Sequence, residues 1–137
     1  MMGGIQSYQD IIAWQKSMDL TVSIYGLAAQ FPKEELYGLS QQMRRAAVSV
    51  SSNIAEGWGR GATGDYLRFL RIARGSLCEL ETQIQLAQRL NFMAPADVQE
   101  LLDGTAECKK VLQGLIGSVE YQQTQNRVAS DNSHGEW

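Results

Sequence analysis

Hydrophobic residues recur every three or four positions along four segments of the chain, which is the period of amphipathic helices and not of strands. The pattern predicts helices over about residues 10–30, 39–56, 63–87 and 95–119. Pro32 ends the first helix, and Pro95 stands at the first position of the fourth. Four helices of about 20 residues with short links are typical of an all-α, antiparallel up-and-down four-helix bundle. We expect residues 1–119 to form this bundle.

Each predicted helix has one face suited to the core. The first presents Ile11, Trp14, Met18, Val22, Tyr25 and Ala29. The second presents Leu39, Met43, Ala46, Ala47, Val50 and Ile54. The third presents Tyr66, Phe69, Leu70, Ala73, Leu77, Leu80, Ile84 and Ala87, and the fourth Val98, Leu101, Leu102, Thr105, Cys108, Leu112, Leu115 and Val119. Trp14, Met18 and Met43 are interpreted as core packing, because aromatic and Met stripes at helical spacing usually are.

Two segments interrupt the helical pattern. Residues 57–64, GWGRGATG, contain four glycines and predict a loop that begins at Gly57, with Thr63 capping the third helix. This loop follows a helix and lacks a Lys followed by Ser or Thr, so it does not fit a phosphate-binding fingerprint. Residues 120–137 are polar and have no period, and we expect a frayed or disordered extension.

A second apolar stripe suggests self-association. On the first helix this stripe lies nearly opposite the predicted core face, and a small bundle buries only one of the two. The third helix has a weaker second stripe. Exposed leucines scattered on a monomer are the alternative interpretation. The residues predicted to form an oligomer interface are Leu20, Ile24, Leu27, Ile72, Leu86 and Leu90.

Charge is distributed unevenly along the 137 residues. The total is −3, from 12 basic and 15 acidic side chains, which by itself argues against a nucleic-acid partner. Residues 39–75, however, hold six arginines against two acidic residues, a net charge of +4, which leaves −7 for the remainder. The acidic total therefore excludes a uniformly basic surface, while the central stretch is suited to contact with a polyanion.

The arginines of this stretch are the candidate nucleic-acid-binding residues. Arg68, Arg71 and Arg74 follow one another at steps of three opposite the core face and predict a basic ridge, in which each guanidinium can bind a phosphate. A solvated face, with Glu79 and Glu81 as salt-bridge partners, is equally consistent with the spacing. The complete set of candidates is Arg44, Arg45, Arg60, Arg68, Arg71 and Arg74.

A polar strip on the second helix favours a structural role. Asn53 lies beside the core and is expected to hydrogen-bond a backbone or neighbouring group, while Glu56 can pair with Arg60 across the helix end. No second carboxylate accompanies Glu56, and the single histidine, His134, lies in the polar tail, so we identify no catalytic residues. Cys78 and Cys108 are not spaced as metal ligands, and neither a metal nor a cofactor is predicted.

The sequence also bears on location. The chain has no apolar run near the ~20 residues that span a bilayer, and its start, MMGGIQSYQD, lacks the basic and then apolar order of a secretory signal. We expect a cytoplasmic protein without a membrane partner, with its two thiols reduced. Cys78 projects away from the predicted core and is expected to be accessible.

Several strings resemble one family. Trp14-Gln15-Lys16, Phe31-Pro32, residues 35–39 (ELYGL), 42–46 (QMRRA), 53–57 (NIAEG), Gly75-Ser76 and residues 79–81 (ELE) are similar to the four-helix bundle proteins named for the 23S rRNA intervening sequence. The resemblance covers about residues 8–92, and it implies a pentameric ring without catalysis. A group related to that family, the accessory variability proteins of diversity-generating retroelements, consists of basic pentamers that bind reverse transcriptase and nucleic acid. The match at Asn53, Glu56, Gly57 and Arg60 is equally well explained by bundle and ring geometry, and we interpret Asn53, Glu56 and Gly57 as a structural motif in which Gly57 lets the chain turn.

These observations lead to two functional hypotheses. The first is a non-catalytic homo-oligomer, a pentamer by resemblance, whose arginines bind RNA or another nucleic acid. The second is an interaction scaffold that docks a partner polypeptide against those arginines and has no nucleic-acid role. Binding to a nucleic-acid phosphate backbone weakens steeply as salt is added, so the salt dependence of binding separates the two hypotheses.

Overall fold

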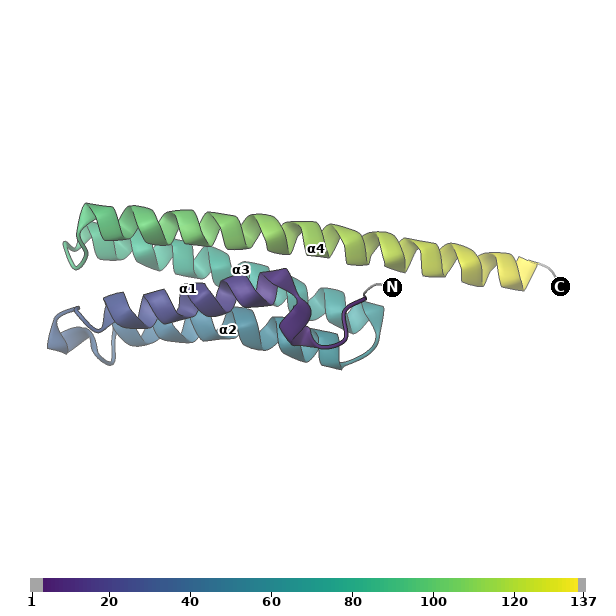
Figure 1. The fold of residues 1–137 in the computed structure, drawn as a ribbon, viewed down its shortest axis with the longest axis horizontal. Coiled ribbons are helices and arrows are strands. Elements are labelled where there is room, and N and C mark those ends of the chain that lie inside the picture. Colours follow the sequence, from purple (N-terminus) through teal and green to yellow (C-terminus); the bar gives the residue numbers. More distant parts are fainter. Residues whose placement is uncertain (1–3, 136–137) are drawn as a thin grey trace.

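Four antiparallel helices form a bundle in the computed structural model, which describes residues 4–135. They are α1 (Ile12–Ala28), α2 (Leu39–Gly59), α3 (Thr63–Arg89) and α4 (Pro95–Gly135), with short 3-10 turns η1 (Tyr8–Asp10) and η2 (Lys33–Glu35) before α1 and α2. Consecutive helices run in opposite directions and pack on one another, and α4 returns to pack beside α1 (Figure 1). The predicted all-α four-helix bundle is confirmed.

The predicted core faces of α2, α3 and α4 are the faces that the structure buries. All six predicted positions of α2 are buried, while on α3 Tyr66 is half-buried and Leu67 and Gln83 are buried although they were not predicted to be. On α4, Ile116 is buried although it was not predicted, and the predicted positions Leu102 and Leu115 are half-buried. The local hydrophobic period was sufficient here because each of these helices has a single dominant apolar face.

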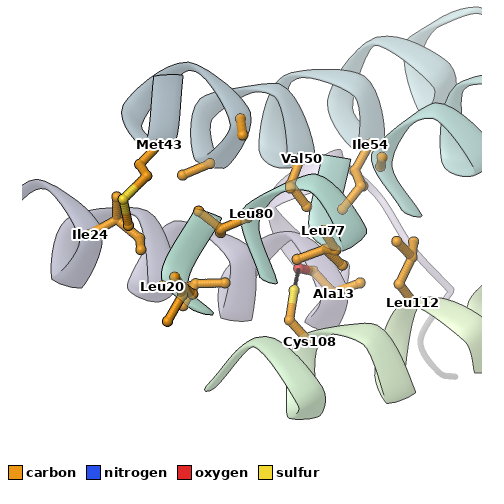
Figure 2. Close-up of a cluster of buried hydrophobic side chains, with 14 of the residues drawn as sticks. Ala13, Leu20, Ile24, Met43, Val50, Ile54, Leu77, Leu80, Cys108 and Leu112 are labelled. Carbon is orange, nitrogen blue, oxygen red and sulfur yellow. Dashed lines mark hydrogen bonds between the residues drawn. The ribbon is translucent and has the colours of Figure 1, made fainter. Parts of the chain in front are cut away.

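The predicted orientation of α1 is wrong. Leu20 and Ile24, assigned to an oligomer interface, are buried in the core with 6% and 0% of their surface exposed, and Leu27 is half-buried against it. In Figure 2, Ile24 lies beside Met43 among side chains from the other helices. The side chains that face solvent are instead those of Met18, Val22, Tyr25 and Ala29, which were predicted to be in the core.

Small residues explain this orientation. The inward face of α1 includes Ala13, Ser17 and Ala28, which are small enough to allow the neighbouring helices to approach closely. Their polar groups are satisfied: the hydroxyls of Ser17 and Ser51 share a hydrogen bond of 2.7 Å, and the Ser40 hydroxyl donates to the Ala28 carbonyl at 3.3 Å. A pattern that counts serine as polar therefore misses this face.

The α2–α3 connection is shorter than predicted. Helix α2 continues through Gly59, and only residues 60–62 link it to α3. Gly57 is consequently a buried helical residue and not the start of a loop, while Gly61, with φ of 80°, makes the turn. Thr63 is the first residue of α3, but the N-cap position belongs to Ala62, which makes no side-chain capping bond.

The carboxyl-terminal extension is helical. Helix α4 continues to Gly135 and projects past the α2–α3 end of the bundle (Figure 1), by ~24 Å beyond Val119 at the helical rise per residue. The expected frayed or disordered extension is thus replaced by helix as far as the structure describes it, and residues 136–137 lie outside the described residues. Most of its side chains between 120 and 132 are exposed, so the extension adds little to the core.

Candidate nucleic-acid interface

Two arginines share one aromatic ring at the α2–α3 turn. The guanidinium carbon of Arg60 lies 5.0 Å from the ring centroid of Phe69, and that of Arg68 lies 4.5 Å from it. Both are favourable cation–π contacts, and the ring itself is almost fully buried. We call these three residues the turn cluster. It holds two positive charges in a fixed place on an otherwise acidic chain.

The ion pairs of the turn cluster are weak enough to exchange. Arg60 pairs with Glu56 at 3.1 Å, as the sequence predicted, and Arg68 approaches Asp65 at 3.8 Å. The four side chains are about half exposed, and exposed pairs of this kind contribute ~0–1 kcal/mol. A phosphate that replaces either carboxylate therefore faces little competition.

Arg71 and Arg74 point to α4 and not to the turn cluster. Arg71 donates to Glu120 at 2.9 Å, and Arg74 donates to Gln113 at 3.2 Å. The three arginines of the predicted ridge therefore do not act together: Arg68 belongs to the turn cluster, whereas Arg71 and Arg74 contact α4. Neither acidic residue proposed as its partner contacts it: Glu79 accepts from Gln83, and Glu81 pairs with Lys109 at 3.5 Å.

Arg44 and Arg45 form a separate site near the start of α2. Arg44 donates to the Leu36 carbonyl at 3.3 Å and lies 5.8 Å from the ring centroid of Tyr25. Both arginines line an open cleft of about 480 Å³ on the α1–α2 side. Fifteen residues of helix, ~22 Å, separate Arg45 from Arg60, so the six candidates do not form one continuous patch.

The polar strip of α2 has the structural role predicted for it. Asn53 donates its side-chain amide to the Ser49 carbonyl at 2.8 Å and to the Ser49 hydroxyl at 3.0 Å. That hydroxyl shares a hydrogen bond of 2.8 Å with Ser76, which joins α2 to α3. These bonds leave Asn53 fixed beside the core.

A cleft beside the turn cluster was not predicted. It has a volume of about 470 Å³ and lies between the α2–α3 turn and α4, with Trp58, Tyr66 and Gln122 in its walls. Burial raises the pKa of the Tyr66 phenol to about 12, so the group stays protonated near neutral pH. Trp58 lies within the glycine-rich segment and Tyr66 just after it, but only the fold brings the two rings to one opening.

The two cysteines differ in environment. Cys78 is exposed, as predicted, while Cys108 is buried and its thiol faces the Ala13 carbonyl (Figure 2). Burial raises the pKa of Cys108 to about 11. Within the described residues, no three His, Cys, Asp or Glu side chains gather as a metal site would require. No helix in that part of the chain combines the length and apolar character needed to cross a membrane.

The fold and the turn cluster define a small antiparallel bundle with arginines grouped on its surface. The model of the family described as the 23S rRNA-intervening sequence protein matches residues 9–114, and this chain belongs to that family. The resemblance read from the sequence motifs is thereby confirmed. The second half of α4 lies beyond the matched region.

A solved structure has the same fold. It is the crystal structure of a protein with unknown function from the S23 ribosomal protein family of Bacteroides thetaiotaomicron VPI-5482, with a TM-score of 0.72 and 23% sequence identity. The likeness covers 77% of this chain and 96% of that one, and at this identity it bears on the fold alone. No curated protein matches this chain.

Proposed function

We propose that this protein is a non-catalytic, cytoplasmic homo-oligomer that binds RNA or another nucleic acid through the arginines of α2 and α3. The observation that carries the proposal is the turn cluster, in which Phe69 holds the Arg60 and Arg68 guanidinium groups side by side and half exposed. Guanidinium groups bind phosphate oxygens in pairs, and their weak carboxylate partners are readily exchanged. Arg71, one helical turn beyond Arg68, pairs with Glu120 of α4 at 2.9 Å, and exchange of this half-exposed pair would add a third guanidinium to the basic surface.

Self-association would multiply this surface. The exposed apolar residues Met18, Val22 and Tyr25 follow a four- and three-residue spacing along α1. On α3 and at its C-cap, Ile72, Leu86 and Leu90 are 43–47% exposed. A closed ring needs two different patches that meet head to tail, and these two stripes are candidates for them. The family resemblance implies five subunits, which would bring five turn clusters together on one particle.

Salt dependence tests nucleic-acid binding. Fluorescence anisotropy with a labelled RNA should show affinity falling linearly, on logarithmic axes, as salt rises from about 50 to about 200 mM. The triple variant Arg60→Gln, Arg68→Gln, Arg71→Gln should bind more weakly, with the slope reduced by about one for each phosphate that it no longer neutralises. An RNA affinity too weak to measure at the lowest salt would refute the proposal.

A charge-matched variant serves as the control. Lys33→Gln, Arg89→Gln, Lys110→Gln removes the same charge from exposed positions away from the turn cluster. It should retain most of the affinity and slope. Equal losses in the two triple variants would show that total charge, and not the turn cluster, governs binding.

Sedimentation tests the assembly. Val22→Glu, in the middle of the α1 stripe, should dissociate the oligomer, whereas Val128→Glu on the extension should not. A stable wild-type monomer at micromolar concentration would overturn the homo-oligomer.

An acidic polypeptide is the second candidate partner. Arg60, Arg68 and Arg71 already contact the carboxylates of Glu56, Asp65 and Glu120, and a partner's acidic side chains would take the same positions. Polyglutamate that binds with wild-type salt dependence, in the absence of RNA binding, would favour this scaffold role.

A further inference from the structure

We propose that the cleft between the α2–α3 turn and α4 receives an unpaired base of a single-stranded nucleic acid, stacked against Trp58 and Tyr66 while the turn cluster holds the neighbouring phosphates. This inference rests on the proposed function and names the class of nucleic acid that it concerns. The cleft and the turn cluster both draw on residues 57–69, and the fold adds Gln122 of α4 and gives the two sites their shared wall.

The two aromatic side chains are available to a ligand. Both Trp58 and Tyr66 are half-buried and line the cleft, so each ring is anchored in the bundle and still reaches its surface. Among the described residues, neither the Trp58 indole N–H nor the Tyr66 hydroxyl has a hydrogen-bond partner, and neither is closed off from solvent. Because the two rings are already anchored, stacking a base on them costs little side-chain entropy. Their free polar groups remain able to hydrogen-bond a ligand.

The cleft has the size and openness that a base requires. Its volume of about 470 Å³ lies within the range of roughly 300–1,000 Å³ found for ligand pockets. Gly59 and Gly61 form part of its wall, and a Cβ added to either would meet no atom within 4 Å. On the opposite side Gln122 of α4 carries an amide, which can both donate to and accept from a base edge.

The turn cluster and the cleft share a wall. Gly57 lines the cleft, and a Cβ at this position would lie 2.7 Å from the Cβ of Phe69, the residue on which Arg60 and Arg68 rest. A strand whose base enters the cleft therefore carries its phosphates past the two guanidinium groups. This combination of an aromatic stacking surface with basic groups along the backbone is typical of single-strand binding.

A duplex does not fit this arrangement. The faces of paired bases are covered by their neighbours in the helix, so a ring at the surface of the protein cannot stack on them. The arginines would contact duplex phosphates equally well. Single-strand binding is thus distinguished from duplex binding by the aromatic residues and not by the charges.

Binding assays on the full chain can test the cleft. Wild type, Trp58→Leu and Tyr66→Leu are compared by anisotropy with single-stranded RNA, single-stranded DNA of the same sequence, and the matched RNA duplex. Loss of one stacked base should weaken single-strand binding by roughly 5- to 150-fold and leave duplex affinity unchanged. The salt slope should not change, since no charge is removed.

A variant that removes no existing contact guards against misfolding. Gly59→Leu places a side chain into open space at the cleft wall and should weaken single-strand binding, whereas Gly117→Leu, an exposed position on α4 with equally open surroundings, should not. In the Trp14→Phe, Trp137→Phe background, quenching of the remaining Trp58 fluorescence by single strands, and not by duplex, reports stacking directly.

The outcomes separate the cleft from the proposed function. Wild type that binds no nucleic acid refutes both. If wild type binds through its arginines and the Trp58, Tyr66 and Gly59 variants keep the wild-type affinity for single strands, the cleft is refuted and the proposed function is not. The same holds if these variants lose affinity for single strands and for the duplex equally. Tighter binding of RNA than of DNA supports an RNA ligand with 2′-hydroxyl contacts, and equal binding supports single strands of either sugar.

Discussion

Gly57 of α2 and Phe69 of α3 are so close that a Cβ added to Gly57 would lie 2.7 Å from the Cβ of Phe69. Tyr66 is also near: its side-chain Cδ1 would lie 3.2 Å and its carbonyl oxygen 3.3 Å from the added Cβ. Only glycine allows the two helices to approach this closely at the turn. The approach positions Phe69 under Arg60 and Arg68, so a packing constraint in the core fixes the geometry of the turn cluster.

Substitution of Gly57 tests this constraint. Gly57→Ala should lower the free energy of unfolding by about 1–3 kcal/mol, because the added methyl group overpacks the contact with Phe69. Gly59→Ala, two residues on in open space, should change it by no more than about 1 kcal/mol. Urea denaturation measures both, and a Gly57→Ala protein as stable as Gly59→Ala would contradict the close approach.

The orientation of α1 gives a second prediction. Ile24→Ala should destabilise the protein by about 2–5 kcal/mol, because the side chain is fully buried against Met43 and its neighbours. Val22→Ala should change the stability of the fold by less than about 0.5 kcal/mol, since Val22 is 71% exposed. Urea denaturation of both variants at the same protein concentration measures the two changes in stability. A larger loss for Val22→Ala than for Ile24→Ala would place the other face of α1 in the core.

The different burial of the two cysteines gives a third prediction, on thiol reactivity. At pH 8, Cys78 should react with a disulfide reagent in the folded protein, while Cys108 should react only on unfolding, because it is buried and about one thiol in a thousand is ionised at its raised pKa. Cys78→Ser should therefore show no fast-reacting thiol, and Cys108→Ala should keep one. Two thiols reacting at equal rates in the native protein would be inconsistent with the burial of Cys108.

Alkaline pH should destabilise the fold. The pKa of Tyr66 is raised from 10.0 to about 12 and that of Cys108 from 9.0 to about 11, so the unfolded chain releases these protons at lower pH than the folded chain. Their contribution to stability is complete below pH 9 and decreases as the pH rises toward 12.

Urea denaturation at a series of pH values measures this loss. Tyr66→Phe removes one of the two groups and should make the loss shallower above pH 10, while Tyr121→Phe, at an exposed position, should follow wild type. If Tyr66→Phe loses stability as steeply as wild type, the phenol does not contribute.

The helical extension should be dispensable for stability. Removal of residues 124–137 keeps Glu120 and Gln122 and should change the free energy of unfolding by less than about 1 kcal/mol, because the residues of this segment that are described through 132 are exposed. Removal of residues 112–137 takes away Leu112 and the core positions after it and should abolish cooperative unfolding. Circular dichroism during thermal unfolding distinguishes the two, and a large loss from the shorter deletion would show that the extension packs on the bundle.

Much of this protein could be predicted from local sequence. The four helices, the core faces of α2 to α4, the Glu56–Arg60 pair and the Asn53 hydrogen bonds all depend on residues within a few turns of one another, where periodicity and spacing are informative. Family membership also followed from short motifs along the chain. The polar extension beyond Val119 was not predicted as helix, because its sequence has no apolar period to indicate one.

The sequence by itself determined the number of helices, most of their buried faces and the concentration of positive charge between residues 39 and 75. Tertiary structure decided which side of α1 turns inward, because that helix has apolar residues on both sides and the small residues Ala13, Ser17 and Ala28 allow one side to pack closely on its neighbours. It also decided the partners of the arginines and the position of Trp58 and Tyr66 in one cleft. The Arg71–Glu120 and Arg74–Gln113 bonds join segments far apart along the chain, and Trp58 and Tyr66 meet across a helix–helix turn, so the helical period of a single segment encodes neither arrangement.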